Sequence, residues 1–221
     1  MSEAFIPYTP HLEIGKEEML IRTLQFYQWA NKRRTVREIS NQPIPKEVME
    51  NILLTAGTAP SGANKQPWTF CVVSNPLLKE EIRKAAEAEE YKSYTERMSK
   101  EWKEDLKPLK TNWEKPFLTQ APYVIVVFKR IYEIEENKKH QNYYVQESVG
   151  LACGLLLSAI HNAGLVSLTY TPSPMNFLLK ILNRPENERP FMVIPVGFAN
   201  KKAQIPNIKR KKINDIAIFY E

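Results

Sequence analysis

The chain alternates between stretches whose apolar residues recur at helical spacing and short runs that are apolar throughout. Apolar side chains three or four residues apart, as at Leu20, Leu24 and Tyr27, predict an amphipathic helix. From this spacing and the turn residues between stretches, helices are expected at residues 17–32, 45–55, 141–163 and 174–182. The third helix is followed by Gly164, the residue type that most readily ends a helix.

Short apolar runs with β-branched residues predict strands at residues 69–74, 122–129, 166–171 and 191–198. The second run, PYVIVVFK, is apolar on both faces, as in a strand that lies inside a sheet. Helices that separate buried strands indicate an α+β or three-layer α/β architecture. At 221 residues, the chain is expected to form a single domain, residues 1–221.

Two segments stand apart from this pattern. Residues 76–115 are densely charged and lack β-branched runs, so we expect mostly exposed helices that act as a surface lid. The aromatic residues of this segment are too widely spaced for a core-facing stripe: Tyr91, Tyr94, Trp102 and Trp113. Residues 201–221 form a C-terminal arm whose last part, INDIAIFYE, is apolar and is expected to add a strand or wrap a partner.

The formal net charge of +6 comes from one place. Residues 201–212 contain six Lys or Arg and no acidic residue, so the rest of the chain is balanced. Such a stretch is usually a solvated face, and less often a phosphate or nucleic-acid contact. A nucleic-acid-binding module is therefore the weaker hypothesis, and we expect no nucleic-acid partner. A purely structural protein is weaker still, because it would leave the arginine clusters described below unexplained.

The composition also restricts cofactors. The two cysteines and three histidines lie far apart, so we expect neither a disulfide framework nor a metal site. No two glycines have the spacing of GxGxxG or Walker A motifs, so side chains would hold a phosphate-bearing cofactor. The chain shows no signal peptide, and its longest apolar stretch is about half of the roughly 20 residues that span a membrane. We expect a cytoplasmic protein without a membrane partner.

The sequence RRTVR is the first candidate for a binding site. Arg33 and Arg37 are four residues apart and converge on a helix or tight turn, and Thr35 adds a hydroxyl. These groups suit a phosphate dianion, and a second basic segment around Arg210 is expected to meet the same phosphate. The alternative is a solvated helix end with cations near its C-terminus.

The loop at residues 57–68 is the second candidate. Its small residues would let a planar ligand approach the backbone, and Ser61 and Asn64 offer hydrogen-bonding groups. It directly precedes a predicted strand, at the kind of sheet edge where ligands bind. The alternative is a long connecting turn, for which Pro, Ser, Gly and Asn are common.

These motifs occur together with ACGLLLSAIHNAGL and a TxTP segment, and the combination resembles the flavin-dependent nitroreductase superfamily from about residue 22 onward. In the charged insert, the LKxLxTNW pattern resembles the iodotyrosine deiodinase branch. The resemblance implies a nitroreductase-like three-layer fold with a mixed, mainly antiparallel central sheet, an intertwined homodimer and FMN as cofactor. It implies reductive dehalogenation of halotyrosines (iodo-, bromo- and chlorotyrosine) with electrons from an external NAD(P)H-driven reductase. A broad NAD(P)H nitroreductase is the alternative.

The same resemblance implies roles for individual residues. It assigns FMN binding to Arg33, Arg34, Thr35, Arg37, Pro60, Ser61, Thr169, Tyr170, Thr171 and Arg210. Thr171 is expected to donate its hydroxyl to flavin N5 as the catalytic residue. The backbone N–H of Ala63 would bind the phenolate oxygen of the substrate. Tyr170 departs from the family, which has threonine at all three positions of this stretch.

Glu90, Tyr94 and Lys115 are the substrate-binding residues that the resemblance implies. Glu90 and Tyr94 are four apart, so a helix presents both on one face. An amino acid is a zwitterion, so its recognition needs an anion for the ammonium and a cation plus a hydroxyl for the carboxylate. Taken one at a time, these residues would read as an ordinary exposed helix surface.

Overall fold

The computed structural model describes residues 5–9 and 12–221. The chain falls into two compact units, Met1–Arg33 and Arg34–Glu221. The expectation of one domain over the whole chain stays a prediction.

The first unit contains one helix, α1 (Lys16–Asn31), which confirms the predicted helix to within one residue at each end. Glu17 and Glu18 lie in the first turn, where acidic side chains favour the helix dipole. No residue of this helix is buried, although Leu20 and Phe26 are large and apolar. Among the described residues of its own unit, the amphipathic helix therefore packs against no partner surface.

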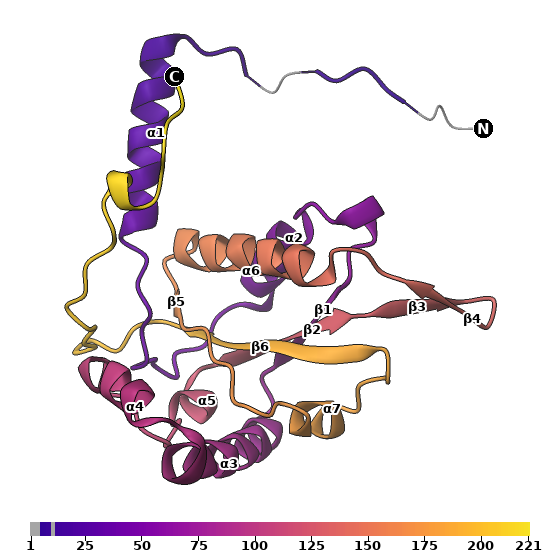
Figure 1. The fold of residues 1–221 in the computed structure, drawn as a ribbon, viewed down its shortest axis with the longest axis vertical. Helices are drawn as coiled ribbons and strands as arrows, with labels where there is room; N and C mark the ends of the chain where they lie inside the picture. The colour runs from indigo at the N-terminus through magenta and orange to yellow at the C-terminus, as the bar shows by residue number, and fades with distance from the viewer. Residues whose placement is uncertain (1–4, 10–11) are drawn as a thin grey trace. The chain divides into compact units, whose positions relative to one another are not determined.

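The second unit is built on a four-stranded sheet (Figure 1). The strands lie in the order β1 (Trp68–Val73), β2 (Tyr123–Arg130), β6 (Glu188–Gly197) and β5 (Val166–Ser167). All three pairings between them are antiparallel. The side chains of Val124–Phe128 in β2 are completely buried, which confirms that this run lies inside the sheet.

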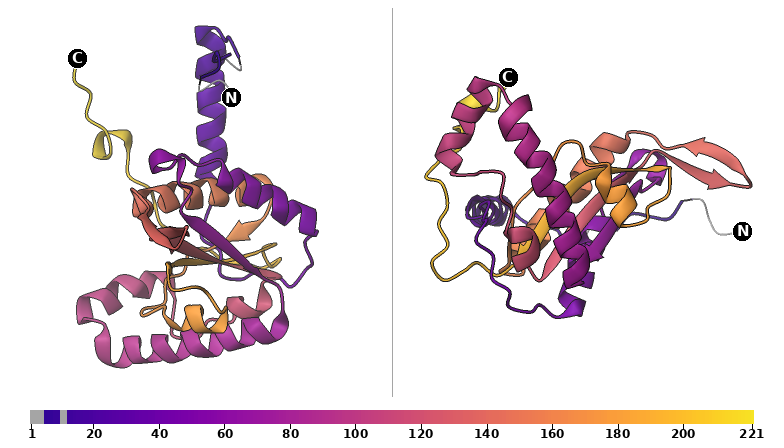
Figure 2. Two further views of the ribbon diagram at one scale, coloured as in Figure 1. Left: turned by 90° about the vertical axis from the view of Figure 1, so that its right-hand side faces the viewer. Right: turned by 90° about the horizontal axis from the view of Figure 1, so that it is seen from below.

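Helices cover both faces of the sheet (Figures 1 and 2). One face carries α2 (Lys46–Gly57) and α6 (Val145–Asn162), whose buried residues include Ile52 and Leu156. The other face carries α3 (Pro76–Lys92), α5 (Phe117–Gln120) and α7 (Phe177–Ile181). Each layer has its own buried apolar cluster, one on either side of the sheet. The predicted three-layer arrangement is confirmed.

The charged segment is helical and mostly exposed, as predicted, but one face of its first helix is buried. After α3 come a π-helical turn, η2 (Ser93–Arg97), a helix, α4 (Lys100–Leu106), and a short 3-10 turn, η3 (Lys107–Leu109). In α3, Lys79, Ile82 and Ala86 are buried. Their spacing of three and four residues makes a narrow stripe that packs on the sheet. The many charges on the rest of the helix concealed this stripe in the sequence.

A hairpin was missed between the second predicted strand and the third predicted helix. It consists of β3 (Tyr132–Glu135) and β4 (Lys138–Gln141), joined by Glu136 and Asn137. Both joining residues have left-handed backbones (φ 48° and 61°), as a two-residue hairpin turn requires. As a result, α6 begins at Val145 instead of residue 141. Its predicted end is confirmed, because Gly164 has φ +73°.

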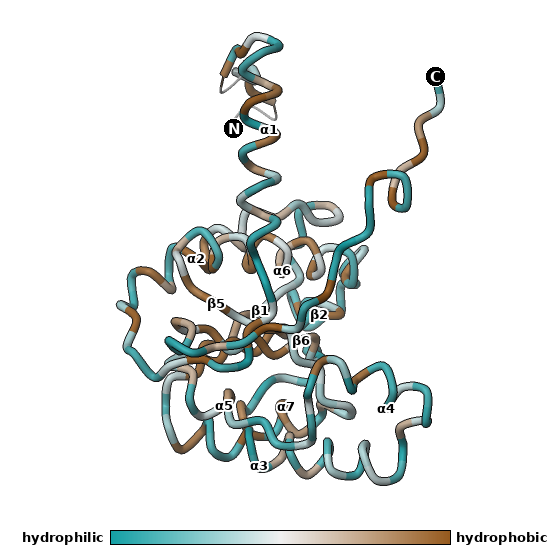
Figure 3. Tube along the Cα trace, turned by 90° about the vertical axis from the view of Figure 1, so that its left-hand side faces the viewer, coloured by the Kyte–Doolittle hydropathy of each residue, from teal (hydrophilic) through white to brown (hydrophobic). Residues whose placement is uncertain are grey.

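Two of the predicted elements are shorter in the structure. The strand expected at 166–171 is β5 at residues 166–167 plus an isolated bridge from Tyr170 to Val193. The helix expected at 174–182 is α7, residues 177–181. The C-terminal arm forms one 3-10 turn, η4 (Ile213–Asp215), and adds no strand to the sheet. Figure 3 shows hydrophobic positions, in brown, near the end of this arm. No helix in the described part of the chain is both long and apolar enough to cross a membrane.

Candidate active site

The arginine segment lies along the edge of the sheet beside β5. Thr35 forms a parallel bridge with Ser167, and the Val36 amide donates to the Ser167 carbonyl at 3.2 Å. Val36 is buried, whereas Thr35 and Arg37 are half-buried on either side of it. This pairing places the segment next to the stretch that continues from Ser167 toward Thr171.

In that stretch, Thr169 and Thr171 are exposed and Tyr170 is buried. The Tyr170 amide donates to the Val193 carbonyl at 2.9 Å, and the Val193 amide donates back at 2.8 Å. Side chains alternate along an extended backbone, so the two threonine hydroxyls point away from the Tyr170 side chain. The predicted flavin contacts of Thr169 and Thr171 therefore belong to the exposed side, and the Tyr170 side chain belongs to the core.

The C-terminal basic segment begins beside the arginine segment. The Arg34 guanidinium donates to the Pro206 carbonyl, and the Gln204 amide donates to the Glu38 carboxylate at 2.9 Å. Arg210 lies four residues beyond Pro206 and is exposed. Arg33 ends the first unit, where its amide donates to the Ala30 carbonyl at 3.1 Å. The convergence of Arg33 and Arg210 on one phosphate stays a prediction.

The loop before β1 has an unusual backbone. Ala63, Asn64 and Gln66 all have left-handed conformations, with φ of 49°, 53° and 46°. Such a backbone is costly for residues other than glycine and is often found at functional sites. The amides of Asn64 and Gln66 are engaged within the loop, by the Ser61 carbonyl at 3.0 Å and the Ser61 hydroxyl at 2.9 Å. Ala63, directly before Asn64, is exposed.

Close packing explains a glycine in this loop. A Cβ atom on Gly62 would lie 2.7 Å from the Tyr144 ring and 3.0 Å from the Tyr143 carbonyl oxygen. Any larger residue would displace the loop from the start of α6. Pro60 is exposed and Ser61 is half-buried at the same loop. The sequence predicted the loop as a site but gave no signal for its left-handed backbone.

Glu90, Tyr94 and Lys115 lie together on the opposite side of the sheet from α6. Glu90 is near the end of α3, Tyr94 is in the π-helical turn η2, and Lys115 precedes α5. The Lys115 Nζ lies 3.3 Å from the Glu90 Oε2, with only 5% and 12% of the two side chains exposed. The same Nζ lies 5.6 Å from the centre of the Tyr94 ring. The structure thus brings together the three residues that were predicted to bind a zwitterion.

Burial dominates the electrostatics of this cluster. It lowers the pKa of Lys115, and the Glu90 carboxylate opposes that effect. Burial also raises the pKa of Tyr94, against a side-chain hydrogen bond with Thr111. Lys115 is further held by the Asn112 carbonyl, which accepts from its Nζ. The charged pair is therefore shielded from water and held in place.

Two further residues hold Lys115 from α3. The Lys115 amide donates to Glu87 Oε1 at 2.6 Å, and Arg83 Nε donates to the same oxygen at 2.8 Å. Arg83 also donates to the Thr119 hydroxyl at 3.0 Å. These side chains attach the backbone around Lys115 to the helix that carries Glu90. Sequence reasoning missed them, because in a charged helix nothing distinguishes them from solvated residues.

Tyr170 joins the cluster from the sheet. Its ring lies 5.7 Å from the Lys115 Nζ and makes an edge-to-face contact with Phe117 at 5.6 Å. Its hydroxyl is buried and has no hydrogen-bond partner. Burial, followed by the nearby Glu90 carboxylate, raises its pKa. The family resemblance assigned Tyr170 to the flavin site. In the structure, its ring contacts Lys115 and Phe117.

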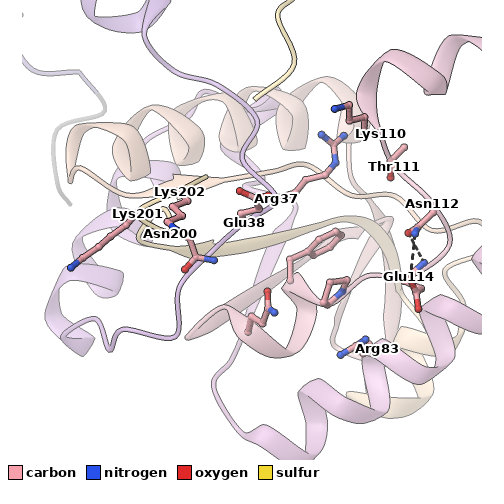
Figure 4. Close-up of a pocket in the computed structure, with 13 residues that line it drawn as sticks. Arg37, Glu38, Arg83, Lys110, Thr111, Asn112, Glu114, Asn200, Lys201 and Lys202 are labelled. Carbon is pink, nitrogen blue, oxygen red and sulfur yellow. Dashed lines mark hydrogen bonds between the residues drawn. The ribbon is translucent and has the colours of Figure 1, made fainter. Parts of the chain in front are cut away.

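An open cleft of about 980 Å³ adjoins the cluster (Figure 4). Three of its lining residues contact the cluster: Thr111 contacts Tyr94, Asn112 contacts Lys115 and Phe117 contacts Tyr170. The basic residues in its lining are Arg37, Arg83, Lys110, Lys201 and Lys202, against two glutamates. This is the size of a site for a small organic ligand, and its charge favours an anionic one.

Comparison with known proteins finds a matching family and relatives that cover most of the chain. The family described as "Nitroreductase family" matches residues 30–198. An iodotyrosine deiodinase of Haliscomenobacter hydrossis is 58% identical over 98% of this chain and 98% of its own length. Human iodotyrosine deiodinase 1 is 46% identical over 96% of this chain and 74% of its own length. A crystal structure of oxidised iodotyrosine deiodinase bound to FMN and 3-iodo-L-tyrosine matches with a TM-score of 0.76 and 35% identity, covering 88% of this chain and 98% of that one.

Proposed function

Because the chain belongs to the nitroreductase family, within its iodotyrosine deiodinase branch, we propose that it catalyses the FMN-dependent reductive deiodination of iodotyrosines. The observation that carries the proposal is the buried pair of Glu90 and Lys115 beside Tyr94. Paired opposite charges next to a hydroxyl match the ammonium and carboxylate of a free amino acid. A generic nitroaromatic substrate would need none of them. We extend the proposal to bromo- and chlorotyrosine, whose amino-acid ends are the same.

The residues beside β5 fit the cofactor. Half-buried Arg34 and Arg37, with Thr35 between them, supply guanidinium and hydroxyl donors of the kind that a phosphate binds. Burial lowers the pKa of Arg37, yet a guanidinium stays charged at neutral pH. Arg33 and Arg210 would complete the phosphate site, with Pro60, Ser61 and Thr169 along the flavin. When bound, FMN supplies two electrons which, with one proton, replace the carbon–iodine bond by a carbon–hydrogen bond and release iodide.

The chain's own residues orient the substrate. Glu90 would bind the ammonium, and Lys115 and Tyr94 the carboxylate, so the Glu90–Lys115 pair opens to admit a zwitterion. The exposed, left-handed backbone at Ala63 would present its amide to the phenolate oxygen. The exposed Thr171 hydroxyl would donate to flavin N5. The insert, residues 76–115, would close over the ligand and exclude water.

We propose further that the protein works as a homodimer. Large apolar side chains are exposed on α1 (Leu20, Phe26), on α6 (Leu151) and on the C-terminal arm (Ile218, Phe219). Apolar surface on this scale marks an interaction site, and a second copy of the chain is the partner that the resemblance implies. Size-exclusion chromatography with light scattering should give twice the chain mass of 25.7 kDa. A monomeric result would contradict the proposal.

We also propose that electrons come from an external NAD(P)H-driven reductase, which would place the enzyme in the cytoplasm with that donor. In the laboratory, dithionite replaces the donor. The test is to compare turnover of diiodotyrosine, 2-iodophenol and a nitroaromatic compound with dithionite as reductant. A deiodinase strongly prefers diiodotyrosine, and Glu90→Gln or Lys115→Ala removes the preference. Equal turnover of all three compounds would instead favour a broad nitroreductase.

A further inference from the structure

Tyr170 is held at two places, so its hydroxyl has a fixed position. Both of its backbone groups bond to Val193, at 2.9 and 2.8 Å. Its ring packs edge to face on Phe117, with centres 5.6 Å apart, and only 8% of the residue is exposed. A side chain with this support has little freedom to turn, and the hydroxyl at its end cannot reach solvent.

The Tyr170 hydroxyl is an unsatisfied polar group. It is one of three buried side-chain polar atoms without a hydrogen-bond partner in the described residues. Besides burial, the Glu90 carboxylate raises the pKa of this hydroxyl and lies close enough for a weak interaction with it, but no hydrogen bond of ordinary geometry joins them. Buried polar groups are nearly always bonded, so an exception requires an explanation. We look for this explanation in the ion pair that Glu90 forms with Lys115.

Glu90 faces Lys115, and its Oε2 lies 3.3 Å from the Lys115 Nζ. A substrate carboxylate that binds Lys115 takes this partner from Glu90. Glu90 is only 12% exposed and must then accept from new donors within the site, and the substrate ammonium alone does not fill both of its oxygens. The Tyr170 hydroxyl is the other donor within the cluster that has no partner.

We propose that the Tyr170 hydroxyl donates to Glu90 when substrate is bound, and so holds the carboxylate in its ammonium-binding position. This inference rests on the proposed function and makes Tyr170 a positioning residue for amino-acid recognition. A threonine at position 170, as the resemblance leads one to expect, would end too close to the backbone to reach Glu90. The tyrosine therefore gives this chain a contact to the insert that a threonine cannot make.

The test uses FMN-loaded Tyr170→Phe and measures the Kd of 3-iodotyrosine and of 2-iodophenol by quenching of flavin fluorescence. Iodophenol has no ammonium and does not need Glu90. We expect about tenfold weaker binding of iodotyrosine, the loss of one hydrogen bond to a charged group, and unchanged binding of iodophenol. The Tm without substrate should not fall, because the hydroxyl had no partner to lose. Tyr123→Phe, on the other side of the sheet, is the matched control and should alter neither Kd.

A double variant separates positioning from general structural damage. In a Glu90→Gln background, Tyr170→Phe should have little further effect on iodotyrosine binding, because the neutral amide no longer binds the ammonium. Equal weakening of both ligands, or the same tenfold loss in the Glu90→Gln background, would overturn the inference. So would unchanged binding of iodotyrosine by Tyr170→Phe. If the wild-type protein itself does not prefer iodotyrosine to iodophenol, the proposed function fails first, and the variants are not needed to show it.

Discussion

Removing both charges of the Glu90–Lys115 pair should cost less than the sum of the costs of removing each one alone. At 3.3 Å and an effective dielectric constant of 20, two unit charges attract by about 5 kcal/mol, from which the burial of both groups must be subtracted. Glu90→Gln leaves a buried ammonium and should lower the free energy of unfolding by about 3 kcal/mol. Lys115→Met leaves a carboxylate that is 12% exposed, so its cost should be smaller, about 2 kcal/mol. The double variant should cost about 2 kcal/mol, not about 5, which gives a coupling of about 3 kcal/mol.

The assay is urea unfolding at fixed protein concentration and saturating FMN, with equal slopes required before free energies are compared. Lys46 and Glu50 form an exposed pair at a similar distance, 3.0 Å, with 84% and 51% of their side chains exposed. Glu50→Gln should change the free energy of unfolding by less than about 0.5 kcal/mol. Additive costs in the Glu90 and Lys115 cycle would refute the reasoning, because they would show that the two charges do not stabilise each other.

Three further predictions concern other parts of the structure. Thr171→Ala should slow dithionite-driven deiodination about tenfold or more, and Thr171→Ser should retain most of the rate, because the hydroxyl is what matters. Gly62→Ala forces a Cβ to 2.7 Å from Tyr144 and should weaken FMN binding in a fluorescence titration, whereas Gly57→Ala, with nothing within 4 Å, should not. Burial lowers the pKa of Lys79 from 10.5, so the folded state binds this proton less well than the unfolded state. The penalty is present at neutral pH and is lost as the pH rises toward 10.5, so the unfolding free energy of wild type relative to Lys79→Met should increase over that range.

Local patterns predicted most of the fold because the long helices and the central strand each have a clear hydrophobic pattern in their own sequence. The run in β2 is apolar on both faces and could only be buried, and α6 has both apolar spacing and a terminal glycine, Gly164. The hairpin at residues 132–141 was missed because its strands are short and exposed and carry charges. Its two-residue turn, Glu136–Asn137, has no glycine to signal a left-handed backbone.

The candidate site was harder to predict, because it depends on contacts between distant segments. Lys115 meets Glu90 only because η2, α4 and η3 turn the chain back between them. Arg34 meets Pro206 across most of the length of the chain. No local pattern encodes contacts between such distant segments, so these residues were predicted only from the resemblance to the nitroreductase superfamily. Tyr170 was assigned with its neighbours, although alternation along an extended backbone turns its side chain away from them.

The ion pair between Glu90 and Lys115 also explains how the site can select zwitterionic ligands without a rigid pocket. A neutral phenol leaves Glu90 and Lys115 paired and gains nothing from them. A ligand with a single charge separates the pair and leaves one buried ion without a partner, which is more costly than not binding it at all. A zwitterion replaces both partners at once. The order of affinity should therefore be iodotyrosine, then iodophenol, then a singly charged analogue such as iodotyramine. Only the zwitterion supplies a new partner for both Glu90 and Lys115, whereas a singly charged ligand leaves one of them unpaired.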